Sequence, residues 1–174
     1  MADNDPDRRK FLKVATCALG GGVGLVAAVP VVRFVLDPAG KTTVSTPSEP
    51  LDLGNVDRFR VGAPPRRVEV IAPLVKDGWT SARDVVLGAA WIRRIEPTKI
   101  EAFSAVCPHL GCAIGWEGKD FLCPCHDSRF SVTGEKTTGP SERGLDPLPV
   151  QIKDGRLQLT WVRYKTGSSS REPV

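Results

Sequence analysis

Histidine, tyrosine and methionine are scarce in this sequence. Its 174 residues include two histidines, one tyrosine and one methionine, so a metal site built on imidazole can use only His109 and His126. Excess charge is also small, because 24 Lys and Arg against 20 Asp and Glu leave a formal charge of +4. That balance gives no argument for nucleic-acid binding without a clustered basic face, and no nucleic-acid partner is expected. With 41% hydrophobic and 25% charged residues, a polytopic membrane protein and a fully disordered chain are excluded.

Cysteine, in contrast, is present in an odd and clustered set. Five cysteines cannot all pair, so at least one lies outside any set of pairs. Four of them, together with both histidines, fall in two boxes, Cys107–Cys112 (CPHLGC) and Cys123–Ser128 (CPCHDS). Thirteen residues separate His109 from Cys123. The fifth cysteine, Cys17, lies in an apolar run and is interpreted as a small apolar residue rather than a ligand.

The N-terminal region contains one long run without charge. No charged residue occurs between Val14 and Val32, and Arg33 closes the run. Nineteen helical residues span about 28 Å, close to the thickness of a bilayer core. The run is longer than the apolar core of most cleaved signals, which favours a retained transmembrane anchor over residues 14–36. Cleavage after small residues such as Val26 and Ala28 is the alternative.

Residues 1–13 read as a targeting region. The pair Arg8-Arg9, followed by Phe11, resembles a twin-arginine export signal, although Asp7 stands where Ser or Thr is usual. Positive residues before the apolar run place the N-terminus in the cytoplasm and the rest of the chain on the far side. We therefore expect a single-pass protein of a bacterial-type cytoplasmic membrane, in contact with lipid, with its main domain on the periplasmic or outer side.

Three further segments follow the anchor. Residues 37–50 are rich in Pro, Thr, Ser and Gly and predict a flexible tether. Residues 51–165 are long enough for one globular core. Residues 166–174 (TGSSSREPV) predict a disordered tail.

The globular segment has the pattern of strands. Val68 and Val70 alternate with polar neighbours, and the same alternation runs through Val150–Trp161. Asp154-Gly155 lies in the middle of that segment and predicts a type I′ hairpin turn. No long helical period is present. The predicted fold is mainly antiparallel β, in small sheets or a partial barrel, preceded by one transmembrane helix.

The two boxes resemble the cluster-binding loops of Rieske iron–sulfur proteins, in the form found in quinol–cytochrome c oxidoreductases of the cytochrome bc type. That family carries Cys-x-His-x-Gly-Cys and Cys-x-Cys-His-x-Ser, and this sequence matches at every Cys and His. The resemblance implies one [2Fe–2S] cluster and a disulfide between the loops. It assigns Cys107 and Cys123 to one iron, His109 and His126 to the other, and Cys112 and Cys125 to the disulfide.

The chemistry of the donor set agrees with this resemblance. Two neutral imidazoles leave less negative charge on a cluster than two thiolates, so its potential lies well above that of plant-type ferredoxins, at roughly −150 to +300 mV. The free ring nitrogens can couple electron uptake to proton uptake. A disulfide closing a loop of about 13 residues contributes on the order of 3 kcal/mol and persists in an oxidising compartment.

A Cys2His2 zinc site is the alternative for the boxes. Zinc takes the same ligand types, but its usual spacing is Cys-x2–4-Cys followed by His-x3–5-His. Here the boxes pair Cys-x-His with Cys-x-x-His, which favours iron–sulfur.

Several neighbours of the boxes are implied to tune the cluster. Ser128 matches a serine that donates to a bridging sulfide, whereas Phe130 stands where high-potential members have a tyrosine. One missing hydrogen bond predicts a lowered potential, which suits menaquinol better than ubiquinol. Asp127 stands where glycine is common, and its charge should lower the potential further. Residues 139–149 resemble the family's proline loop, which covers the cluster.

The resemblance implies a catalytic redox subunit of a quinol–cytochrome c oxidoreductase. Quinol bound to a cytochrome b subunit would give one electron to the cluster and a proton to a histidine, His126 or else His109. The electron would then pass to a c-type cytochrome. The alternative is the small Rieske subunit of a molybdenum oxidase such as arsenite oxidase, which relays electrons without quinol chemistry. A structural metal module is the third possibility.

Overall fold

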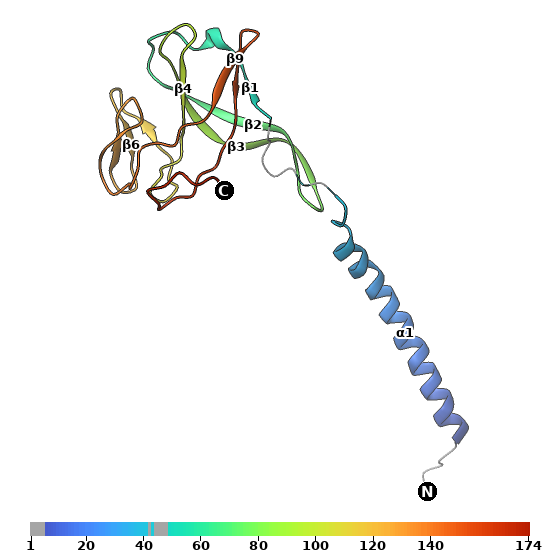
Figure 1. Cartoon of the computed structure of the whole chain (residues 1–174). Coiled ribbons are helices and arrows are strands. Elements are labelled where there is room, and N and C mark those ends of the chain that lie inside the picture. Colours follow the sequence, from blue (N-terminus) through green and yellow to red (C-terminus); the bar gives the residue numbers. More distant parts are fainter. Residues whose placement is uncertain (1–5, 42, 44–48) are drawn as a thin grey trace. The chain divides into compact units, whose positions relative to one another are not determined.

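A computed structural model describes residues 6–41, 43 and 49–174. It divides into two compact units. One contains the N-terminal helix α1 and a short turn at residues 76–80, and the other contains the β-strands (Figure 1).

Helix α1 (Pro6–Leu36) is one continuous helix of 31 residues. It begins at a proline, which suits a first helical turn, and it continues through Pro30 to Leu36. Its most apolar window has a mean hydropathy of 2.0, and none of that window is buried. The helix is therefore long and apolar enough to cross a membrane, as predicted, and it includes most of the expected targeting region.

Part of the predicted tether falls on residues that are not described. Within residues 37–50, positions 42 and 44–48 lie outside the described residues, and residues 37–40 form a turn.

One three-stranded sheet of the second unit has the order β1-β10-β9. Its strands are β1 (Leu51–Asn55), β9 (Val150–Lys153) and β10 (Arg156–Leu159), with a short 3-10 turn, η1 (Val56–Arg58), after β1. Leu157 pairs with Ile152 across the predicted hairpin. Both turn residues have positive φ, +50° at Asp154 and +71° at Gly155, as the type I′ turn requires.

Two more antiparallel sheets complete the second unit. One contains β2 (Arg66–Lys76), β3 (Ser81–Arg94) and β4 (Ile100–Ser104) in that order. The other contains four short strands in sequence order, β5 (Gly115–Trp116), β6 (Phe121–Cys123), β7 (Ser128–Phe130) and β8 (Lys136–Thr138). We call the first two sheets the base, and the β5–β8 sheet with the loops 105–114, 123–128 and 139–149 the loop half.

Two hydrophobic cores lie on opposite faces of the β3–β4 pair. Side chains alternate along a strand, so Ile92 of β3 packs into the base core while Trp91 packs into the core of the loop half. In β4, Ala102 packs into the base core and Phe103 packs into the core of the loop half. The pair is thus a wall shared by both cores, which explains why all four residues from Ala89 to Ile92 are buried.

Candidate metal centre

The first box is a tight loop between β4 and β5. The Cys107 amide donates to the Cys112 carbonyl at 2.7 Å, and the Gly111 amide donates to the Cys107 carbonyl at 2.9 Å. An antiparallel bridge between Val106 and Ala113 closes the loop. The result buries Cys107 and leaves His109 half-buried.

The second box is the turn between β6 and β7. Cys123 pairs with Ser128 at its base, and both residues are buried. Cys125 and His126 lie exposed at its tip. Asp127 has a φ of +53°, in the left-handed region where glycine is favoured and where Asp and Asn are the best tolerated alternatives. This backbone conformation gives a physical reason for a glycine preference at the position.

A disulfide joins the two loops. It links Cys112 to Cys125 across a Cα–Cα distance of 6.6 Å and a sequence separation of 13. The pairing implied by the resemblance is therefore present. The Sγ atoms of Cys112, Cys123 and Cys125 all lie within 4.8 Å of one another, but the disulfide removes two of these sulfurs as thiolate ligands.

The two remaining thiols of the boxes lie together beneath the loops. Cys107 and Cys123 are free and each only 1% exposed. Burial is the main cause that raises the pKa of the Cys107 thiol to about 11, with a smaller contribution from the neighbouring Cys123 thiol, while hydrogen bonds from the His109 and Leu110 backbone act in the opposite direction. A metal bound here must therefore displace a proton from sulfur.

The two imidazoles also meet. The rings of His109 and His126 lie edge to face with their centroids 4.9 Å apart. The loops thus bring together two buried thiols and, nearer to solvent, two imidazoles. Every Cys and His in the boxes is accounted for by these two pairs and the disulfide.

Ser128 and Phe130 lie at the bottom of the site and are completely buried. The Ser128 hydroxyl accepts a hydrogen bond from the Ser141 amide at 3.2 Å, so its own proton is free to point elsewhere. Phe130 packs in the same core cluster as Cys107 and Cys123. A phenyl ring offers no hydrogen-bond donor at this place.

The loop 139–149 packs directly on the second box. A Cβ at Gly139, whose φ is +89°, would lie 2.4 Å from the Ser128 Cα, so only glycine permits this approach. The loop then returns to the base, where the Leu148 amide donates to the Ala102 carbonyl at 2.9 Å. The residues of the expected proline loop therefore pack against the second box.

Comparison with known proteins agrees with this geometry. A family model for the Rieske [2Fe-2S] domain matches residues 75–150. The menaquinol:cytochrome c reductase iron-sulfur subunit of Geobacillus thermodenitrificans is 30% identical over 167 residues, which cover 91% of this chain and 95% of that protein. The chain belongs to the Rieske iron–sulfur family. The corresponding Bacillus subtilis subunit is 30% identical over 90% of this chain and 92% of its own length. The cytochrome b6-f complex iron-sulfur subunit of Chlorobaculum thiosulfatiphilum is 31% identical over 88% of this chain and 72% of its own length.

Membership confirms the predicted fold class, the [2Fe–2S] cofactor and an electron-transfer role. The donor set fits a Rieske cluster, because two thiols and two imidazoles converge from two loops that a disulfide holds together. The iron–sulfur interpretation therefore stands over the zinc alternative.

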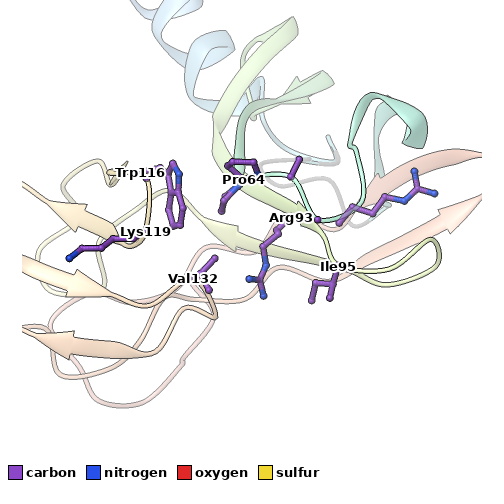
Figure 2. Close-up of a pocket in the computed structure, with 11 residues that line it drawn as sticks. Pro64, Arg93, Ile95, Trp116, Lys119 and Val132 are labelled. Carbon is purple, nitrogen blue, oxygen red and sulfur yellow. The ribbon is translucent and has the colours of Figure 1, made fainter.

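The cavity shown in Figure 2 is separate from this Rieske site. Its volume is about 350 Å³, and it lies between the ends of β3 and β5 with Trp116 and Pro64 on its walls. None of its lining residues belongs to either box. Its polar groups do not converge: Lys119 points away in Figure 2, and the Arg94 guanidinium donates to backbone carbonyls, including that of Pro97 at 2.8 Å.

One part of the Rieske site was missed in the sequence. Residues 166–174, expected to be disordered, make backbone hydrogen bonds to the first box and to the rest of the chain. Arg143 and Asp146 form a buried ion pair in the proline loop; Arg143 donates to the Ser168 carbonyl of this segment, and Asp146 pairs with its Arg171. A run of Ser, Gly and Pro has no apolar period, so no pattern indicated that its backbone would be held by a distant arginine.

Proposed function

We propose that this Rieske protein is the iron–sulfur subunit of a membrane quinol–cytochrome c oxidoreductase. It takes one electron at a time from menaquinol bound by a cytochrome b subunit and passes it to a c-type cytochrome. The observation that carries this proposal is the position of His126, exposed at the tip of a loop whose thiols are buried.

The ligand assignment follows the two pairs in the structure. Cys107 and Cys123 would hold one iron through their buried sulfurs, and His109 and His126 would hold the other through one ring nitrogen each. When bound, the cluster supplies a one-electron redox couple at a potential of roughly −150 to +300 mV.

The exposed residues account for contact with quinol. The outer ring nitrogen of His126 would accept a hydrogen bond from the quinol hydroxyl and take its proton as one electron passes to the cluster, which leaves a neutral semiquinone, so charge and protons balance in this step. Leu110, with 61% of its surface exposed beside His109, offers apolar contact to the pocket that holds the ring. His126 is therefore the proposed catalytic residue, and His109 is the second candidate.

The proposed quinol rests on Phe130 and Asp127. Phe130 removes one donor from the neighbourhood of Cys107 and Cys123, and the Asp127 carboxylate adds negative charge at the loop tip. Both lower the potential, which matches a low-potential quinol. The relatives named as menaquinol:cytochrome c reductase subunits support the same choice.

The N-terminal helix fits the same role. Arg8-Arg9 acts as the twin-arginine address, α1 remains as a single-pass anchor in lipid, and the Rieske domain lies on the outer side of the cytoplasmic membrane. An unprocessed N-terminus, with the Rieske domain digested by protease added to the outer face, is the expected result.

Purification of the native complex tests the function directly. Co-purified cytochrome b and c-type haem support the proposal, whereas a molybdenum subunit would establish the relay role instead. Titration of the midpoint potential against pH should give a flat region that falls once a histidine of the oxidised protein loses its proton. A potential independent of pH throughout would remove the proton-coupled step.

A further inference from the structure

The C-terminal segment, residues 163–174, folds back on itself. The Lys165 amide donates to the Glu172 carbonyl at 2.9 Å, and the Val174 amide donates to the Arg163 carbonyl at 3.0 Å. Tyr164 forms an antiparallel bridge with Pro173. The segment is thus a closed loop with its own backbone pairing.

The turn of this loop lies on the first box. The Gly167 amide donates to the Pro108 carbonyl at 2.9 Å, and a Cβ on Gly167 would lie 3.6 Å from the His109 carbonyl oxygen. A Cβ on Gly111 would lie 3.9 Å from Thr166 Cγ2. The C-terminal segment therefore contacts the backbone around His109.

Arg143 of the proline loop clamps this turn. Its guanidinium forms a bidentate pair with Asp146, with two N–O distances of 2.8 Å, and the side chains are 4% and 6% exposed. The same guanidinium donates to the Lys165 carbonyl at 2.8 Å and also to the Ser168 carbonyl. These two carbonyls flank the turn that holds Gly167.

Arg143 is also connected to the second box. The Ser141 hydroxyl donates to the Arg143 carbonyl at 2.8 Å, and the Ser141 amide donates to the Ser128 hydroxyl at 3.2 Å. One continuous path of hydrogen bonds therefore runs from Ser128 through Ser141 and Arg143 to the C-terminal segment and on to Pro108. It joins the two boxes on a route separate from the disulfide.

We propose that Arg143 is a positioning residue, which uses the C-terminal segment to fix the first box, and with it the His109 ring, relative to the second box. The inference rests on the proposed role of His109 as an iron ligand. The planar guanidinium can serve Asp146 and two carbonyls at once, whereas an ammonium group cannot reproduce that arrangement. Loosening the clamp should let the His109 loop move while the disulfide and the base remain intact.

The variant Arg143→Lys tests this in the full-length protein, with Arg94→Lys as the matched control. Arg94 is also largely buried and donates to the backbone carbonyls of Val56, Phe59 and Pro97, but it lies in the base. Three readouts are compared: the EPR line shape of the reduced protein, the midpoint potential against pH, and hydrogen exchange of the amides in residues 107–112.

In Arg143→Lys we expect exchange in the first box to become about tenfold faster, which corresponds to the loss of one hydrogen bond. The EPR line shape and the pH at which the potential begins to fall should shift as well. Arg94→Lys should lower the melting temperature without changing any of the three. If Arg143→Lys only lowers the melting temperature, and its three curves superimpose on those of the wild type, the proposal is overturned.

A second variant, Gly167→Ala, keeps the ion pair and strains only the turn on His109, since Gly167 has a φ of +67°. It should shift the same EPR signal. If Arg143→Lys fails to retain iron, an unchanged EPR signal in Gly167→Ala refutes the inference. Loss of iron from both variants, with base amides still protected, supports it. Absence of a Rieske EPR signal from the wild type would contradict the proposed function instead.

Discussion

In the base, β9 and β10 bury Leu157 and Leu159 in a regular sheet, whereas no strand of the β5–β8 sheet in the loop half exceeds three residues. The base core is mainly aliphatic, whereas in the core of the loop half the rings of Trp91, Phe103 and Trp116 surround Phe121 in tilted or edge-to-face contacts. The loop half adds a disulfide and a buried ion pair. Regular burial holds the base, and cross-links between loops hold the site.

This contrast predicts that the largest loss of folding stability comes from the base. Leu157→Ala removes a completely buried side chain and should lower the free energy of unfolding by about 2–5 kcal/mol. Denaturant unfolding followed by tryptophan fluorescence measures the change. Leu110→Ala, at an exposed position, should stay within about 0.5 kcal/mol. Equal losses in the two variants would contradict the burial argument.

Removing the cross-link should affect the loop half more than the base. The double variant Cys112→Ala and Cys125→Ala loses a bond across 13 residues, which corresponds to about 3 kcal/mol. The visible absorbance of the cluster should then fade faster in the presence of a chelator, while far-ultraviolet circular dichroism changes little. A cluster as durable as that of the wild type would show that the disulfide is dispensable.

Within the loop half, single side chains should alter potential without altering fold. Phe130→Tyr adds a hydroxyl in the core cluster that contains Cys107 and Cys123, and should raise the midpoint potential. Phe121→Tyr, in the same core, serves as the control for added volume. No upward shift in Phe130→Tyr would remove the argument for a low-potential quinol.

Asp127→Gly should also raise the potential, because it removes a negative charge from the loop tip. It should leave the protein at least as stable, since glycine adopts the φ of +53° without strain. Redox titration and thermal unfolding of the same sample measure both effects. A lower melting temperature would contradict the backbone argument.

The smallest effect is expected at the C-terminal segment. The Ser170 hydroxyl, which donates at 2.6 Å, and then Lys165 hold the pKa of Glu172 below its ordinary value of 4.5. A carboxyl whose pKa is depressed in the folded state stabilises the fold at pH values above its ordinary pKa. This stabilisation is lost as the pH falls through the pKa of the folded state. The small difference in melting temperature between the wild type and Glu172→Gln at pH 6 should shrink as the pH falls below 4.5. A difference in melting temperature that grows on acidification would contradict a lowered pKa of Glu172.

The sequence predicted the base and the site to different depths. Alternation at Val150–Trp161 and the Asp154-Gly155 turn were enough for β9 and β10, because that hairpin is local. The boxes were visible as motifs, but their contact with residues 163–174 was not. That contact depends on Arg143 reaching backbone carbonyls more than 20 residues away, and backbone acceptors leave no mark on residue type.

The wall formed by β3 and β4 has a consequence for how the protein unfolds. Neighbouring residues such as Trp91 and Ile92 belong to different cores, so opening either core removes the backing of the other. We therefore expect the base and the loop half to melt in one cooperative transition, and we expect no cut between them to yield two pieces that each fold alone.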